Sequence, residues 1–515
     1  MNFHPRTHAA LWPDRPALIM ADRGECLTYG ELIERSDRAA SLFSSMGVKE
    51  CNTVAFLLEN HIRYPELIWA AKNSGLRYVC VSTHLNAADT AYILEDCDAR
   101  LLVCSAATRA VASAAVAGLA NPPLLLLIDG AVPPFRSYEV ELAGQPSVPP
   151  VERRRGPSML YSSGTTGRPK GVATAIPDAM PEQPPQRFAM LLDQYGFGPD
   201  TVFINPGPFY HAGPNRFMVS VLRAGGTVIG FSRFDADAVL DAIGRYQATH
   251  GFFVPTMFRR LLALPPERRC AAPTGSLRHA IHGAAPCPIE VKRQMIDWWG
   301  PIVSELYSGT EAFGHTFITA REWLDHPGSV GRPASGCEVR IVDEAGRMLG
   351  VGEVGRIMMR NGLRIAYHGD DAKTAALYDP EGFASLGDIG YLDADGYLYL
   401  TDRENHMIIV GGVNIYPQEA ELALASHPAV ADVAVIGVPD PDMGEAVKAI
   451  IELHAGYSPG PALADALIAH GRARLSLHKC PRTIDFVDRL PRTEMGKLAK
   501  HELRRRYWPD NARMI

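Results

Sequence analysis

Residues 161–172 read YSSGTTGRPKGV, a run of hydroxyl side chains and glycines with one lysine near its end. Glycines let backbone N–H groups approach an anion closely, hydroxyl groups donate hydrogen bonds, and Lys170 adds a positive charge. The spacing from Gly164 through Gly167 to the lysine is G-x-x-G-x-x-K, which does not match the G-x-x-x-x-G-K-[ST] phosphate-binding loop. By itself, the segment is either an anion-binding loop or an ordinary surface turn.

The segments around this loop alternate between β-rich runs and helical patterns. Strand-like runs at 53–60, 78–83 and 100–106 are each followed by a helical pattern, at 61–75, 86–97 and 108–119, and the alternation resumes over 225–247 and 251–264. Such alternation predicts βαβ units and largely parallel sheets. The proline-rich segment 176–187 is expected to form a surface loop.

The pattern changes from about residue 335 onward. Gly- and Asp-rich turns at 337–360 and 390–403 predict β-hairpins. Beyond them, a compact αβ region is expected, with helices at 414–428 and 461–475 and strands at 430–440 and 446–453. We therefore predict a large domain over residues 1–402 and a small C-terminal domain over residues 403–515.

The composition is that of a soluble globular protein, with 515 residues, 47% hydrophobic residues and a net charge of -6. This charge gives no basic excess for nucleic acid or an anionic membrane surface. No secretory signal is evident, and the longest apolar run, at 124–128, is too short to span a bilayer. The nine cysteines are scattered without metal-binding spacing, which predicts mostly buried free thiols and a cytoplasmic location.

Six further motifs follow the 161–172 segment in order. They read NPGPFYHAG (205–213), HGAAPCP (282–288), LYSGTE (306–311), ASLGDIGYLDADGYLYLTDR (384–403), GGVNIYPQEAE (411–421) and LPRTEMGKLAK (490–500). Over essentially the whole chain, this series resembles the adenylate-forming superfamily, and bacterial acyl-CoA synthetases most. The resemblance implies two αβ layered subdomains and a distorted β-barrel in the large domain, and a small α+β lid domain on a hinge.

The resemblance also implies a reaction with two halves. A carboxylate would attack the α-phosphate of ATP, with Mg²⁺ as cofactor, to give an acyl-adenylate and pyrophosphate. The thiol of CoA would then take the acyl group, which makes the protein an AMP-forming acid–thiol ligase. Transfer to a carrier-protein thiol or to an amine is the alternative. A nucleotide binder without catalysis is disfavoured, because Lys170, Glu311, Asp388, Arg403 and Lys497 are all present.

Individual roles follow from the same resemblance. Lys497 is expected to bridge the α-phosphate and the acyl carboxylate, and Glu311 to bind Mg²⁺ with Thr165 near the metal. Asp388 would accept from the ribose hydroxyls, Arg403 would donate to ribose or phosphate, and Tyr307 would offer a flat face to adenine. The other expected nucleotide contacts are Ser162, Ser163, Gly164, Thr166, Gly167, Lys170, Gly283, Ala284, Ala285, Ser308, Gly309 and Thr310.

In the family, the second half-reaction requires the small domain to swing on its hinge. The pivot is expected at Asn405, where many members carry Asp or Lys. Gly411 and Gly412 would then line the channel for the CoA pantetheine, since glycine leaves a narrow tunnel open. Val413 stands where an acidic residue is common, a second departure from the family pattern.

The acyl pocket is expected to be apolar and built from small residues. By position it would comprise His211, Gly213, Phe253, Gly283, Ala284, Ser308 and Phe313. No Asp or Arg is evident among them to hold a second charged group, so we expect a hydrophobic monocarboxylate: a fatty, aryl or polycyclic acid. Gly213 and Gly314 indicate room for a bulky group or tight backbone packing. His211 either gates the pocket or packs in the core. The sequence does not decide the oligomeric state, and a homodimer is one alternative.

Overall fold

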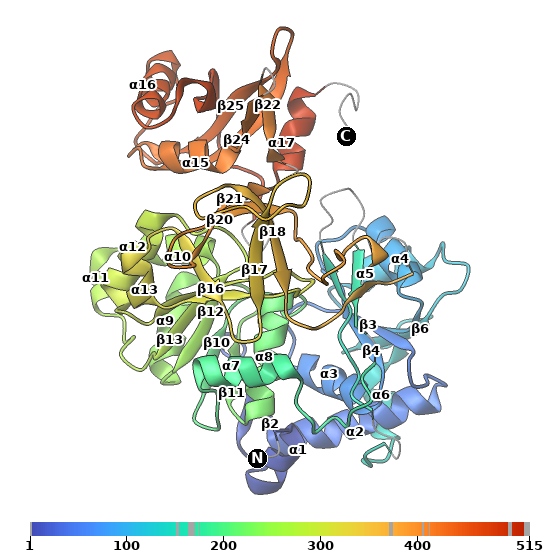
Figure 1. Cartoon of the computed structure of the whole chain (residues 1–515). Coiled ribbons are helices and arrows are strands. Elements are labelled where there is room, and N and C mark those ends of the chain that lie inside the picture. The colour runs from blue at the N-terminus through green and yellow to red at the C-terminus, as the bar shows by residue number, and fades with distance from the viewer. Residues whose placement is uncertain are drawn as a thin grey trace.

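The computed structural model describes residues 3–150, 154–162, 170–174, 176–369, 374–403, 406–410, 413–492 and 497–508. Its central feature is a sheet with thirteen described strands (Figure 1). In spatial order these are β17 (Glu338–Val342), β18 (Gly355–Arg360), β20 (Asp388–Leu392), β21 (Leu398–Arg403), β16 (Ser329–Pro333), β15 (Thr316–Ile318), β14 (Val303–Tyr307), β13 (His279–Gly283), β12 (His250–Phe253), β10 (Val202–Asn205), β11 (Thr227–Gly230), β1 (Pro16–Met20) and β2 (Glu25–Thr28).

This long sheet is parallel from β1 to β14 and antiparallel at both ends. The parallel part confirms the βαβ units predicted from the alternating pattern. The helices of this part of the chain are α1 (Pro5–Leu11), α2 (Tyr29–Ser45), α7 (Gln186–Tyr195), α8 (Ala212–Ala224), α9 (Ala236–Arg245), α10 (Pro255–Leu262), α11 (Pro266–Cys270), α12 (Ile289–Trp299) and α13 (Ala320–Asp325). Both α2 and α13 begin with a Thr/Glu capping box, at Thr28 and Thr319.

A second, fully parallel sheet forms the other αβ layer. Its strands are, in order, β4 (Arg77–Cys80), β3 (Thr53–Leu57), β5 (Ala99–Ser105), β6 (Leu124–Ile128) and β7 (Arg136–Ser137), with helices α3 (Tyr64–Asn73), α4 (Ala87–Asp96), α5 (Arg109–Val116) and α6 (Tyr138–Ala143). Buried Asn60 joins this layer to the long sheet, because it donates to the carbonyls of Gly207 and Phe231 and accepts from the Phe209 N–H. The loop that carries the 205–213 motif is therefore held from both sides.

The region predicted as a distorted β-barrel is antiparallel, as its hairpin pattern indicated. Strands β17, β18, β20 and β21 continue the long sheet through the pairing of β16 with β21. A separate short sheet contains β19 (Ala366–Tyr367), β9 (Lys170–Ala173) and β8 (Leu160–Ser162), and Val172 of β9 packs in the same core cluster as Ile341 and Ile357. The pairings among described residues close no ring here, so the barrel form itself is not confirmed.

The C-terminal domain has its own sheet and its own core, and Figure 1 shows it above the β20–β21 hairpin. Its elements are β22 (Ile408–Val410), β23 (Val413–Ile415), β24 (Val430–Asp440), β25 (Gly444–Leu453), β26 (Thr483–Val487), α15 (Pro417–Ala425), α16 (Pro461–Arg472) and α17 (Lys500–Tyr507). The expected helices and strands of this region are confirmed. The last strand of the long sheet, β21, ends at Arg403, and the first strand of the C-terminal sheet, β22, begins at Ile408. The domain boundary at 402/403 stays a prediction.

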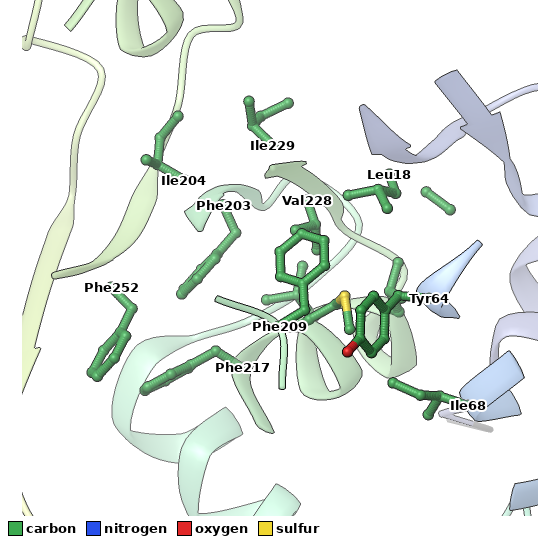
Figure 2. Packing of buried hydrophobic residues seen from close by; sticks show 14 of the residues in the cluster. Leu18, Tyr64, Ile68, Phe203, Ile204, Phe209, Phe217, Val228, Ile229 and Phe252 are labelled. Carbon is green, nitrogen blue, oxygen red and sulfur yellow. The ribbon is translucent and has the colours of Figure 1, made fainter. Parts of the chain in front are cut away.

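Aromatic side chains fill the space between the long sheet and α8. The ring of Phe217 on α8 packs between Phe203 of β10 and Phe252 of β12, at centroid distances of 5.4 and 4.9 Å (Figure 2). Tyr64 of α3 meets Phe209 edge-on at 5.8 Å, which extends this core toward the second sheet. The packing fixes α8, and with it the loop at the helix N-terminus.

All nine cysteines are free thiols, and Cys80, Cys97, Cys104, Cys337 and Cys480 are buried as expected, whereas Cys26, Cys51 and Cys270 are exposed. The described helices include none with the length and hydropathy that a bilayer crossing requires. No metal-binding group of three or more His, Cys, Asp or Glu side chains occurs in the described part of the chain. Residues 176–185 form a loop before α7, as the proline content predicted.

Gly390 tests the close pairing of β20 with β21. A Cβ at this position would overlap the Tyr399 carbonyl oxygen of the neighbouring strand, so Gly390→Ala should destabilise the large domain by about 2–3 kcal/mol. Gly396 in the turn of the same hairpin has φ +79° and no atom near its missing Cβ, so Gly396→Ala should cost only about 1 kcal/mol. Thermal unfolding of both variants checks the difference, and equal shifts in Tm would contradict the tight pairing.

Candidate functional site

Three of the sequence motifs meet at one edge of the long sheet. Strands β10, β13 and β14 are parallel, and each runs at its carboxyl end directly into a motif, at 205–213, 282–288 and 306–311 respectively. In parallel sheets, the loops after the carboxyl ends lie together and form the usual ligand site. The first and last of these motifs begin about a hundred residues apart in sequence, yet they lie at the same edge of the sheet. The second and third are direct neighbours, since Gly283 pairs with Leu306.

Asp388 lies at the centre of the predicted nucleotide contacts. Its Oδ2 accepts a 2.6 Å hydrogen bond from the Tyr307 hydroxyl, and its Oδ1 accepts a 2.9 Å bond from Arg403 Nε. Burial, and then the Asp388 charge, raise the pKa of Tyr307, so the phenol stays a neutral donor. A carboxylate has about four acceptor positions, which leaves Asp388 able to accept two further donors.

Glu311 and Lys497 are brought to this centre from different domains. Among the described residues, Glu311 makes no ion pair or hydrogen bond, so its oxygens are available to a cation. Burial, and then the charge of Arg403, lower the pKa of Lys497, while the charges of Asp388 and Glu311 act to raise it. The Lys497 side chain keeps solvent-accessible surface.

The loops that carry the other predicted contacts are tightly packed. Ala284 and Ala312 have left-handed backbones, with φ of +69° and +54°. A Cβ at Gly283 would lie 2.5 Å from the Leu306 carbonyl oxygen, so only glycine fits there. The Ser308 hydroxyl donates to the Gly314 carbonyl at 2.8 Å and thereby fixes the turn after β14. Ala285, Gly309 and Thr310 belong to the same two loops.

Arg216 is a residue of this region that sequence reasoning missed. It lies on α8, and its Nη2 donates to the Thr310 carbonyl at 2.7 Å, directly beside Glu311. The residues expected in the acyl pocket include no arginine, and Arg216 was not among them. It reaches the 306–311 loop only through the packing of α8, a tertiary contact for which the local sequence gives no signal.

Phe253, expected in the acyl pocket, lies on the face of β12 that packs against α10 and α12. Side chains alternate along β12, so Phe253 packs against Phe258 and Trp299, on α10 and α12, on the opposite face of the sheet from α8. Its neighbour Phe252 lies against Gly213, where an added Cβ would be 2.8 Å from the Phe252 ring. The strand is buried on both faces, so the sequence held no signal to choose between them.

The remaining pocket predictions divide into two groups. His211 caps α8 at its N-terminus, and its ring lies 4.8 Å from Tyr210. Phe313 is buried in the core of the antiparallel region, with its ring 5.7 Å from Tyr378. Phe313 therefore serves packing in this structure, whereas His211 and Gly213 lie at the sheet edge that carries the site.

Several predicted residues lie outside the described parts of the chain: Ser163, Gly164, Thr165, Thr166, Gly167, Asn405, Gly411 and Gly412. Ser162 and Lys170 are partners in the register of the β8–β9 pair. The structure thus describes the backbone on both sides of the opening motif. The predicted roles of these residues remain predictions.

A charged bridge joins the two domains next to the Lys497 segment. Asp432 of β24 accepts from Arg259 of α10 at 3.1 Å, and from Arg492 at 2.6 Å through each of its two oxygens. Burial alone would raise the pKa of Asp432, but these two arginines outweigh it and hold the pKa below its usual value. Because that pKa is depressed, the bridge is fully present at neutral pH and weakens only as the pH falls through it.

Asp402 forms a second connection at the end of β21. Its Oδ2 accepts from the backbone N–H of Gln418 at 2.8 Å, in the first turn of α15, and its Oδ1 lies 3.3 Å from His406 Nδ1. A carboxylate at a helix N-terminus satisfies an otherwise unpaired N–H and interacts favourably with the helix dipole. The start of the small domain is therefore fixed to the strand that carries Arg403.

Comparisons with known proteins agree with this geometry. Residues 5–363 match the family model described as AMP-binding enzyme, and residues 419–497 match the AMP-binding enzyme C-terminal domain. A feruloyl-CoA synthase of Amycolatopsis sp is 33% identical over 506 residues, covering 96% of this chain and 98% of the relative.

Two solved structures share the fold over nearly the whole chain. ATP-bound MatB from Rhodopseudomonas palustris is 30% identical with a TM-score of 0.84, covering 98% of this chain and 99% of its own. The amide bond synthetase McbA from Marinactinospora thermotolerans is 28% identical with a TM-score of 0.84, covering 99% and 100%. The similarity therefore extends across both domains.

Tyr307→Phe tests whether the Asp388 centre binds the nucleotide. The variant keeps the aromatic face but removes the donor to a buried carboxylate, so ATP affinity should fall about tenfold. Isothermal titration with ATP measures this. Tyr507→Phe removes a similar bond, from Tyr507 Oη to Asp485 within the small domain, and is expected to leave ATP affinity unchanged. Equal affinities for the wild type and Tyr307→Phe would place the nucleotide elsewhere.

Proposed function

Because the chain belongs to the AMP-binding, adenylate-forming enzyme family, we propose that it is an ATP-dependent acyl-CoA ligase. Activation of an acid through an adenylate is the chemistry that the family shares. The observation that supports the proposal is the hydrogen-bonded group of Tyr307, Asp388 and Arg403. The charges of Asp388, Glu311 and Arg403 act on Lys497 as well, which is consistent with one shared site.

In the first half-reaction, a carboxylate oxygen of the acid attacks the α-phosphorus of ATP. A P–O bond forms to the acid, and the bond to pyrophosphate breaks. Charge on the transferring group increases, so catalysis depends on positioning and on charge stabilisation. Lys497 supplies a positive charge on a residue of the mobile domain, and Asp388 accepts from the ribose hydroxyls while Tyr307 and Arg403 hold its orientation.

The residues present fit a Mg²⁺ ion. Bound Mg²⁺ would neutralise phosphate charge, and it needs only one or two protein oxygens besides phosphates and water. Glu311, which makes no ion pair or hydrogen bond among the described residues, offers a carboxylate for it, and Thr165 is the proposed second residue near the metal. The charge of Glu311 also acts to raise the pKa of both Arg216 and Lys497.

For the second half-reaction, we propose CoA as the acceptor. The small domain, which we take to begin at residue 403, would turn about Asn405 and bring Gly411 and Gly412 to the pantetheine channel. The similarity to feruloyl-CoA synthase favours a thiol acceptor. The similarity to an amide bond synthetase supports a second candidate, in which an amine takes the acyl group. The free thiols are consistent with a cytoplasmic location.

The Arg259–Asp432–Arg492 bridge acts, in this proposal, as a latch for the first half-reaction. Arg492 precedes Lys497 by five residues, and β24 binds Arg259 of the large domain. The latch therefore constrains the segment that carries Lys497. Because this contact joins residues of different domains, a swing of the small domain must break it.

Lys497→Ala should reduce pyrophosphate release at least about a hundredfold, because a charge that stabilises the transition state is lost. ATP binding, measured by titration, should change little. Lys479→Ala is a matched control, since Lys479 forms an exposed ion pair with Glu419 inside the small domain. Retained pyrophosphate release in Lys497→Ala would remove this lysine from the mechanism.

Asp432→Asn should slow pyrophosphate release about 10- to 100-fold, because Lys497 would be held less firmly above the nucleotide. Asp440→Asn is the control, since Asp440 lies on the same strand but binds Arg482 within the small domain. Stopped-flow measurement of the first half-reaction distinguishes the two variants. If both behave as wild type, the latch has no part in adenylation.

The proposed function itself is tested by pyrophosphate release from purified protein with ATP and Mg²⁺. A panel of fatty, aromatic and polycyclic acids is tested with and without CoA, and products are identified by mass spectrometry. Acyl-CoA in the complete mixture is the expected result. Acyl-AMP without a thioester would favour the amine or a carrier protein as acceptor. No pyrophosphate with any acid would overturn the proposal.

A further inference from the structure

A buried ion pair adjoins the 282–288 motif. Lys292 Nζ donates to Glu305 Oε2 at 2.6 Å, and both side chains are buried. His282 is fully buried as well, and its Nε2 lies 3.5 Å from the same oxygen of Glu305. One carboxylate oxygen thus has two nitrogen-bearing side chains beside it. None of these three residues has a part in the proposed adenylation step.

The pair joins the elements that border the two nucleotide loops. His282 and Glu305 are register partners on the adjacent parallel strands β13 and β14, so their side chains point to the same face of the sheet. Lys292 is the fourth residue of α12, the helix that begins directly after the motif. The chain from His282 to Lys292 therefore forms a loop whose two ends both reach Glu305.

The backbone between these two ends has a demanding conformation. Ala284 has a left-handed backbone with φ of +69°, which is uncommon for a residue other than glycine. A Cβ at Gly283 would lie 2.5 Å from the Leu306 carbonyl oxygen, so this loop and β14 are in close contact. Such a conformation persists only where the surrounding structure holds it. Gly283, Ala284 and Ala285 are among the expected nucleotide contacts, so the shape of this loop bears on nucleotide binding.

Glu305 also lies close to the Asp388 centre along the chain. Tyr307, which donates to Asp388 at 2.6 Å, is two residues further along β14. The contacts of Glu305 therefore fix the end of the strand that carries Tyr307, together with the base of the neighbouring loop.

The surroundings of the pair are apolar. The Lys292 ammonium lies 4.9 Å from the ring centroid of Trp323, and the His282 ring lies 5.5 Å from that of Phe258. Burial raises the pKa of Glu305, and the Lys292 charge opposes that shift. Burial, and then the Lys292 charge, lower the pKa of His282, so its ring is neutral. The dipole of α12 also disfavours a cation in the first turn of the helix, which makes this an expensive place for a lysine.

Stability of the fold does not explain such a pair. Replacing a buried ion pair with apolar side chains of similar volume is often neutral or stabilising. A hydrogen-bonded pair differs from apolar packing in that it fixes the direction in which its two partners meet. The benefit of the pair is therefore expected in the geometry of the loops that it joins.

We propose that Glu305 and Lys292, with His282 beside them, are positioning residues that hold the 283–288 loop and the end of β14 in the arrangement that receives the adenine base. This role rests on the proposed function and assigns the base selectivity of that site to side chains behind its loops. They act through the backbone of the loop and the strand.

The first test removes the pair without leaving a lone buried charge. The double variant Lys292→Met/Glu305→Leu should keep the wild-type Tm or exceed it. Its affinity for ATP, measured by calorimetric titration, should fall about tenfold. The ratio of kcat/KM for ATP to that for GTP, from pyrophosphate release, should fall at least about fivefold, because a loosened loop discriminates less between bases.

A second variant separates stability from positioning. Glu305→Gln keeps an acceptor oxygen for Lys292, so the ATP-to-GTP ratio should stay within about threefold of the wild type. Its Tm should fall, because the charge of Lys292 is no longer compensated. A merely structural pair would instead make base selectivity follow Tm in both variants.

The matched control is a second ion pair of the large domain. Arg6 of α1 donates to Asp37 of α2 through two hydrogen bonds of 2.6 and 2.9 Å, and Figure 1 shows both helices at the end of the large domain that is far from the C-terminal domain. Arg6→Met/Asp37→Leu should leave ATP affinity and the ATP-to-GTP ratio unchanged.

Wild-type ATP affinity and base selectivity in Lys292→Met/Glu305→Leu would overturn the positioning role and leave the proposed ligase function intact. Selectivity that is lost together with Tm in Glu305→Gln would also overturn it. If no acid gives pyrophosphate, the ligase function fails, and calorimetric titration with ATP and with GTP still decides the role of the pair. A lower ratio of the two affinities in the double variant would support that role, and an unchanged ratio would remove it.

Discussion

The site depends on how the Asp388 carboxylate is held between the Tyr307 hydroxyl and the Arg403 guanidinium. Tyr307 is the last residue of β14, the last of the parallel strands in the long sheet, and Arg403 ends the strand that precedes the small domain. One carboxylate therefore couples the parallel layer, the antiparallel hairpin and the exit toward the hinge. Displacement of any of these elements changes the acceptor on which the nucleotide contacts depend.

Contacts between the domains hold the segment that carries the proposed reactive cation, Lys497. Lys497 belongs to the small domain, yet its charge is felt together with those of Asp388, Glu311 and Arg403. The bridge through Asp432 and the cap that Asp402 provides for α15 are polar contacts of buried carboxylates, each of which has its own set of donors. Such contacts suit a domain that is held firmly for one step and released for the next.

Local patterns in the sequence were sufficient to predict many of the helices and strands and to identify the motifs. Strands β24 and β25 of the C-terminal sheet and the hairpin at 390–403 follow directly from periodicity and turn residues, whereas β22, β23 and β26 were not predicted. Contacts between distant segments were not predictable in this way. Arg216 reaches the Thr310 carbonyl only because α8 packs on the sheet, and Phe252 and Phe253 are identical in type, so only strand orientation separates pocket from core. Asp432 gave no signal, since its partners lie far away in sequence.

The most direct test of a site formed by both domains is a crystal structure with a hydrolysis-resistant acyl-adenosine sulfamate. In that structure the adenine should pack against Tyr307, the ribose hydroxyls should donate to Asp388, and Lys497 should contact the sulfamate. The Asp432 bridge should be intact. An analogue bound away from Asp388, or bound there with Lys497 distant and the bridge closed, would contradict the central claim that the two domains together form the adenylating site.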